Sequence, residues 1–137
     1  MYERILIPVD LAHRARLEKA LKIGADLSKH YNAPVVYVGV TSSQPNQVAH
    51  NPKEYAEKLT AFGKEEAAKH GIVASTHPYS SHDPAVDLVE TLLRAAEESG
   101  ADLIVMASHV PGLSDHIFAS HAGQLASHAS VSVFVVR

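Results

Sequence analysis

The chain of 137 residues contains no cysteine, which excludes disulfide bonds, thiol chemistry and cysteine-based zinc sites. It has no signal peptide and no apolar run of transmembrane length, so we expect a cytoplasmic protein without a membrane partner. Its 12 basic and 15 acidic residues give a net charge of −3, which argues against a nucleic-acid-binding surface. A hydrophobic content of 46% over this length predicts a single domain, residues 1–137.

Basic residues are also scarce in one particular region. Residues 1–70 contain 10 lysines and arginines, whereas residues 71–137 contain 2, and none lies between Arg94 and Arg137. An anion bound in the second half of the chain would therefore depend on backbone N–H groups, hydroxyl groups, histidines or a bound cation.

Short apolar runs alternate with amphipathic helical patterns along the chain. We expect strands near residues 4–10, 35–40, 72–78, 103–107 and 131–136, and helices near 14–31, 54–70, 84–99 and 120–129. Between the second strand and the second helix, residues 41–52 predict a long, mobile polar loop. The alternation predicts an α/β fold with a parallel sheet that is covered by helices on both faces.

The predicted topology also limits where a ligand can bind. In an open parallel sheet, ligands bind beyond the carboxyl ends of the strands, where the strand order reverses. The candidates are therefore Asp10, Val40 and Thr41, the turn at residues 80–83, and the residues from Ala107 onward.

Three segments resemble universal stress proteins: Ile5-Leu-Ile-Pro-Val-Asp10, Asp102-Leu-Ile-Val-Met-Ala-Ser-His109 and Val131-Ser-Val-Phe-Val-Val-Arg137. The resemblance covers essentially the whole chain and is strongest to small single-domain bacterial members with an Ala-Ser-His-x-Pro loop. It implies a doubly wound sheet of five parallel strands in the order 3-2-1-4-5, the adenine nucleotide alpha hydrolase-like arrangement. It also implies a pocket for ATP, ADP or AMP, with or without Mg²⁺, between strands 1 and 4.

The resemblance further implies a set of nucleotide-binding residues. Asp10 corresponds to the family's acid after strand 1, and Val40 to the backbone position that faces adenine. The glycines of the family's phosphate motif correspond to Ala107, Val110 and Ala119, and the hydroxyl residue that follows them corresponds to Ser120. The full set is Pro8, Val9, Asp10, Val40, Met106, Ala107, Ser108, His109, Gly112, Ala119, Ser120 and His121.

The replaced glycines leave two functions open. Glycine lets the backbone approach a phosphate closely and adopt a positive φ, which a β-branched residue such as Val110 opposes. One function is a nucleotide-responsive binding module of the stress response, and the alternative is a dimeric interaction protein that has lost ATP binding. Because the sequence shows no oriented nucleophile and no catalytic acid pair, we expect no enzyme activity beyond slow ATP hydrolysis.

The last predicted strand, from Val131 to Val136, is apolar and lies at the edge of the sheet in the implied order. An open apolar edge promotes aggregation. The resemblance implies that this edge pairs with a second copy, so we expect a homodimer that also contacts a protein partner still to be identified.

The ten histidines raise the question of a metal site. They form no His-x-x-x-His pair and no glutamate-containing zinc motif, so we predict no metal ligand among them.

Overall fold

Five parallel strands form one sheet in the order β3-β2-β1-β4-β5, which confirms the predicted fold class. This computed structural model describes residues 1–108 and 116–137, without the side chains of residues 116–120. The strands are β1 (Ile5–Val9), β2 (Val35–Ser42), β3 (Ala74–Ser81), β4 (Leu103–Ala107) and β5 (Ser132–Val136). The central strand β1 pairs with β2 on one side and with β4 on the other.

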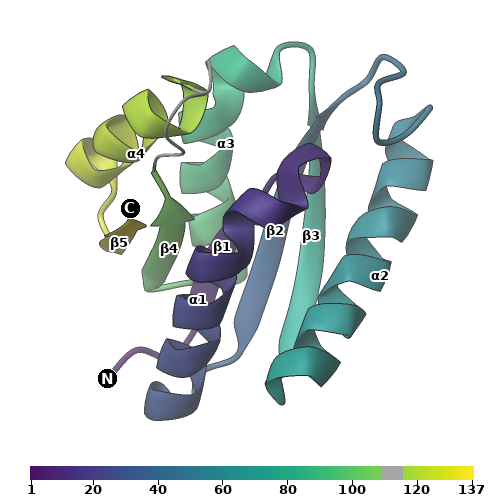
Figure 1. Ribbon diagram of the computed structural model, residues 1–137. Helices are drawn as coiled ribbons and strands as arrows, with labels where there is room; N and C mark the ends of the chain where they lie inside the picture. The colour runs from purple at the N-terminus through teal and green to yellow at the C-terminus, as the bar shows by residue number, and fades with distance from the viewer. Residues whose placement is uncertain (109–115) are drawn as a thin grey trace.

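Helices cover both faces of the sheet (Figure 1). The helices are α1 (Glu18–Tyr31), α2 (Pro52–His70), α3 (Pro84–Ser99) and α4 (His116–His128). Ile5 and Ile7 belong to the core under α1 and α2, whereas Leu6 belongs to the core under α3 and α4. Every residue of β1 is buried, because alternate side chains of this strand enter opposite cores.

The ends of α2 and α3 follow from local side-chain chemistry. Asn51 Oδ1 accepts a hydrogen bond of 2.8 Å from the backbone N–H of Glu54, so α2 begins earlier than the predicted residue 54. Asp83 accepts from the backbone N–H of Val86 at 3.3 Å and caps α3. Gly71 and Gly100 end the two helices at positive φ. No helix among the described residues is long and apolar enough to cross a membrane.

Three other predicted elements have different boundaries. The helix predicted from residue 14 is preceded by a 3₁₀ segment, η1 (Leu11–Leu17), which is interrupted at His13 and capped by Asp10. Strand β3 lies later than predicted, at Ala74–Ser81, in register with β2 up to Ser42. Helix α4 begins at His116 instead of residue 120.

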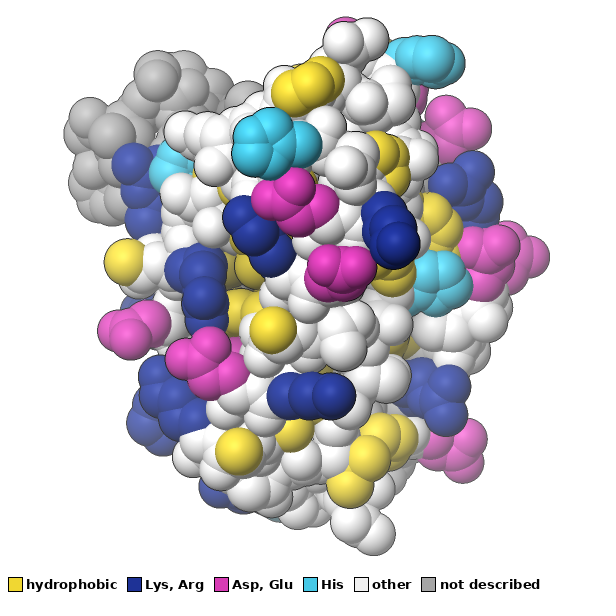
Figure 2. All heavy atoms as spheres, turned by 90° about the vertical axis from the view of Figure 1, so that its right-hand side faces the viewer, with side chains coloured by type: hydrophobic (Ala, Val, Ile, Leu, Met, Phe, Trp, Pro, Cys, Tyr) yellow, Lys and Arg dark blue, Asp and Glu magenta, His cyan; other side chains and the backbone are white. Residues whose placement is uncertain are grey.

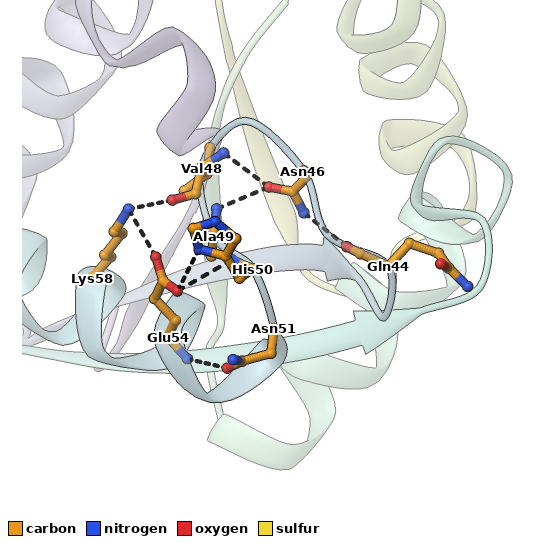
Figure 3. A network of polar contacts seen from close by, with 8 residues as sticks. All are labelled: Gln44, Asn46, Val48, Ala49, His50, Asn51, Glu54 and Lys58. Carbon is orange, nitrogen blue, oxygen red and sulfur yellow. Dashed lines mark hydrogen bonds and ion pairs between the residues drawn. The ribbon is translucent and has the colours of Figure 1, made fainter.

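Residues 43–50, which we call the strap, connect β2 to α2 and are held by hydrogen bonds (Figure 3). Asn46 Oδ1 accepts from the backbone N–H groups of Val48 at 2.9 Å and Ala49 at 3.1 Å. Lys58 Nζ donates to the carbonyl oxygen of Val48. The loop predicted over residues 41–52 is confirmed over residues 43–51, whereas Thr41 and Ser42 extend β2 and Pro52 begins α2. The side chain of Asn46 organises the strap.

The close contact between α2 and β3 generates a prediction about two helical glycines. A methyl group at Gly63 would overlap with Cγ2 of Thr76, whereas one at Gly123 on α4 meets no described atom within 4 Å. Alanine is the better helix former by about 1 kcal/mol. We expect Gly123→Ala to raise the free energy of unfolding by up to about 1 kcal/mol, and Gly63→Ala to lower it by about 1–3 kcal/mol. Urea unfolding followed by circular dichroism measures both, and stabilisation by Gly63→Ala would contradict the packing of α2 on β3.

Candidate functional site

A cavity of about 370 Å³ lies at the carboxyl ends of β1 and β2, where the parallel sheet predicts a ligand. We call it the strand-end cavity. Its walls are Pro8, Val9 and Asp10 at the end of β1, Val38 and Val40 of β2, and residues from Asp83 to Leu92 at and after the start of α3. The lining is mostly apolar. Among the described residues that form it, Asp10 and Asp83 are charged, and none is a lysine, arginine or histidine.

A second cavity, of about 220 Å³, adjoins the first and is covered by the strap. We call it the strap cavity. Both cavities are lined by Asp10, Val40 and Pro84, and the strap contributes Gln47 and Val48 to the second one. Asp10 and Val40, which the sequence predicted separately, therefore meet at the junction of the two cavities.

The carboxylate of Asp10 is fixed by two contacts within its own segment. Its Oδ1 accepts a hydrogen bond of 3.0 Å from the backbone N–H of Ala12, and its Oδ2 lies 2.8 Å from Nδ1 of His13. The first contact caps η1 and is the ordinary role of an aspartate at a helix start. The second contact fixes the orientation of the carboxylate group. Asp10 therefore offers both cavities a charged hydrogen-bond acceptor with a defined orientation.

Tyr55 of α2 is a site residue that the sequence did not indicate. The helical pattern placed it on the buried side of α2, and its ring is indeed buried, but it also lines the strap cavity. Burial, together with the negative charge of Asp10, raises the pKa of the Tyr55 hydroxyl. A Cβ at Gly39 would overlap with this hydroxyl, so the glycine of β2 makes room for it. The only sequence clue was a hydroxyl-bearing side chain on an otherwise apolar helix face.

Asp83 and Pro84 are also brought to the strand-end cavity. The sequence indicated their turn as a candidate position and, more strongly, as the start of a helix. The structure shows that both descriptions apply, because Asp83 caps α3 while it lines the cavity.

The predicted residues on β4 lie apart from the described walls of these two cavities. Met106 is completely buried in the core under α3 and α4. Ser108 donates two hydrogen bonds to the carbonyl oxygen of Val136, from its backbone N–H at 2.8 Å and from its hydroxyl at 3.2 Å. Ala107, the last residue of β4, is partly exposed and pairs with Val136.

The remaining predicted residues fall at or beyond the edge of the described chain. His109 and Gly112 lie outside the described residues, as do the side chains of Ala119 and Ser120, whose backbone belongs to α4. For His121, the ring Nδ1 is buried and has no hydrogen-bond partner among the described atoms. Within the described part of the chain, no group of three histidine, aspartate or glutamate side chains could hold a metal ion.

Comparison with known proteins connects this geometry to a family. The chain is 26% identical to universal stress protein G of Shigella flexneri over 143 residues, with full coverage of both chains. A universal stress protein solved in complex with cAMP has a TM-score of 0.72 at 17% identity, covering 99% of this chain and 97% of that one. The universal stress protein of Archaeoglobus fulgidus in complex with dAMP has a TM-score of 0.67 at 21% identity, covering 99% and 98%. At these identities the two solved structures show the shared fold.

The family assignment itself comes from the sequence of the whole chain. The model of the universal stress protein family matches residues 1–137, without a gap at either end. The sheet order, the residue pattern of β1 and the position of Asp10 agree with the resemblance on which the prediction was based. The chain therefore belongs to the universal stress protein family.

Proposed function

We propose that this protein binds an adenine nucleotide in the strand-end and strap cavities and acts as a nucleotide-responsive module of the stress response. The observation that carries the proposal is the apolar cavity of about 370 Å³ at the ends of β1 and β2, with the fixed carboxylate of Asp10 at its margin. Its volume lies in the range of small-molecule sites, which are mostly apolar with a few placed polar groups. Two relatives of the same fold were solved with cAMP and with dAMP, which share the adenine base.

The charges of the two cavities favour the nucleoside part of the ligand over its phosphates. Asp10 and Asp83 repel an anion, whereas a carboxylate accepts hydrogen bonds from an amino group or a ribose hydroxyl. Val40 offers backbone groups and an apolar side chain to a flat base. We therefore place adenosine between Asp10 and Val40, and assign the phosphates, with any Mg²⁺, to the segment from Ala107 through Gly112 to Ser120.

We further propose that the protein binds ATP, ADP or AMP without efficient turnover, works in the cytoplasm, and changes its contacts with a protein partner. Among the described residues, the Asp10–His13 pair has no serine or threonine nucleophile hydrogen-bonded to it. An activated nucleophile needs such a base within hydrogen-bond reach.

The alternative function is that of an interaction protein that has lost ATP binding. It is favoured by the absence of lysine and arginine from residues 95–136 and by Val110 at a position where the family's motif has glycine. The two functions differ in whether any adenine nucleotide binds at all.

Titration with adenosine, AMP and ATP, with and without Mg²⁺, separates the two functions. Because the described walls of the two cavities contain no cationic side chain, we expect all three ligands to bind with dissociation constants within about tenfold of one another. Calorimetry measures these constants. Acid precipitation of protein that was purified without added nucleotide shows whether a bound adenine nucleotide is released into the supernatant. ATP binding about a hundredfold tighter than AMP would refute the nucleoside-dominated mode. No binding of any ligand at millimolar concentration would refute nucleotide binding and favour the alternative function.

The variant Asp10→Asn tests the proposed contact without removing the cap of η1. The amide oxygen still accepts from the backbone N–H of Ala12, but the charged acceptor is lost. Since a hydrogen bond to a charged group contributes about 1.5–3 kcal/mol, we expect AMP affinity to fall by about tenfold or more. Asp26→Asn, which alters an exposed carboxylate on α1, is the matched control. Equal AMP affinity in the two variants would remove Asp10 from the binding site.

The two edges of the sheet differ in a way that supports a homodimer. On β3, Pro78 lacks a backbone N–H, His77 is exposed, and Tyr79 donates to Glu98 at 2.6 Å. On β5, by contrast, Phe134 and Val135 are 43% and 36% exposed. Natural edge strands are protected by proline and polar groups, and β5 carries neither beyond Ser132. We propose that a second copy covers β5.

If a second copy covers β5, a charged residue on this strand should lower the molecular mass of the protein in solution. Phe134→Lys should shift the protein from dimer to monomer, because a buried lysine without a partner opposes the pairing. His77→Lys on β3 is the control and should leave the dimer intact. Light scattering at micromolar concentration measures both variants, and a monomeric mass for the unmodified chain would contradict the proposal.

A further inference from the structure

A third cavity, of about 430 Å³, lies on the α2 side of the strap and adjoins the proposed nucleotide site. We call it the strap–α2 cavity. The strap and η1 form the wall that this cavity shares with the strap cavity, because both cavities are lined by Leu11, Ala12, Gln47 and Val48. The other walls come from Arg14 of η1 and from α2.

Unlike the two cavities of the proposed nucleotide site, this one is lined by basic side chains. Arg14 enters it from η1 and Lys58 from α2, and Glu65 is the one acidic lining residue that the structure describes. Figure 2 shows the molecule from the α2 side, where basic and acidic side chains are interleaved and apolar side chains are visible between them. The strap–α2 cavity thus combines two cations and one carboxylate with an apolar surface.

Both cations are held in place by contacts that a ligand can replace. The guanidinium carbon of Arg14 lies 4.9 Å from the centre of the Phe62 ring, and its Nη2 lies 2.9 Å from Oε2 of Glu65. Lys58 Nζ lies 3.3 Å from Oε1 of Glu54 and donates to the carbonyl oxygen of Val48. The side chains of Arg14 and Lys58 are 47% and 50% exposed, and ion pairs at this exposure add little to stability. Replacing the glutamate partners of Arg14 and Lys58 by a ligand anion therefore costs little folding free energy.

We propose that the strap–α2 cavity binds a small phosphomonoester that carries an apolar group. A phosphomonoester has close to two negative charges at neutral pH, which matches the two cations better than a carboxylate does. Arg14 supplies a planar set of donors and Lys58 a mobile point charge, the two modes by which proteins hold phosphate. Leu11, Val48 and Ala61 supply the apolar surface for the rest of the ligand.

The position of Lys58 links this site to the strap. Lys58 connects α2 to the backbone of Val48, so a phosphate that recruits its ammonium group competes with that contact (Figure 3). Backbone N–H signals of the strap therefore report on the ligand directly.

Phenyl phosphate is a suitable probe because it combines the phosphomonoester with one flat apolar ring. Titration into the ¹⁵N-labelled full chain should shift the backbone N–H signals of Ala61, Phe62 and Glu65, which line this cavity alone, more than those of Val9 and Val40. Arg14→Gln and Lys58→Gln should each weaken binding by about tenfold or more, whereas Arg14→Lys, which keeps the charge but not the planar donors, should weaken it less than Arg14→Gln. Lys64→Gln is the matched control, since Lys64 is exposed on α2 and is not part of the lining. Circular dichroism verifies that each variant is folded.

Two competing ligands distinguish this site from the nucleotide site and from a general affinity for anions. Saturating adenosine, which has no phosphate, should leave the affinity for phenyl phosphate within about twofold, and phenylacetate, with a single charge, should bind about tenfold more weakly. Displacement by adenosine, or signal shifts centred on Val9 and Val40, would place the probe in the nucleotide site and overturn the proposal. Equal loss of affinity in Lys64→Gln and Lys58→Gln, equal affinity for phenylacetate, or no binding at millimolar concentration would overturn it as well.

Discussion

The burial of β1 on both faces is the constraint on which the rest of the structure depends. Its side chains enter two cores, and each fully buried isoleucine or leucine contributes about 1.5–3 kcal/mol. Helix α1 packs so closely on this strand that a methyl group at Gly24 would overlap with Cδ1 of Ile7. All five residues of the strand are apolar and buried. The first charged residue after β1 is therefore Asp10, at the rim of the sheet, where it is available to a ligand.

Much of the fold could be predicted because it depends on patterns that repeat along the chain. Apolar runs indicated β1, β2 and β4, and the stripe that includes Val89 and Leu92 indicated α3. The strand order came from the family resemblance and not from the periodicity. Once the strands are parallel, their carboxyl ends lie at one edge, so the meeting of Asp10 and Val40 at one cavity also followed from the sequence.

The strap and its cavities could not be predicted, because they depend on individual contacts that leave no periodic pattern in the sequence. Asn46 fixes the strap through two backbone N–H groups, and Lys58 ties it to α2 through one carbonyl oxygen. Tyr55 was predicted to be buried, but the direction of its hydroxyl depends on the space left by Gly39, a residue on a different element. Such pairings between distant residues become visible only when the chain is folded.

The strap separates two kinds of charge, and this separation bears on what the protein can sense. Acidic groups line the strand-end cavity, and Arg14 and Lys58 line the cavity behind the strap. In the proposed mode, the nucleoside supplies most of the binding free energy, so occupancy follows the total adenine nucleotide pool more closely than the ratio of ATP to AMP. A protein with this selectivity can respond to a phosphate group only through a second binding site. The basic strap–α2 cavity is suited to this role, because a phosphate bound there contacts the wall that the two sites share.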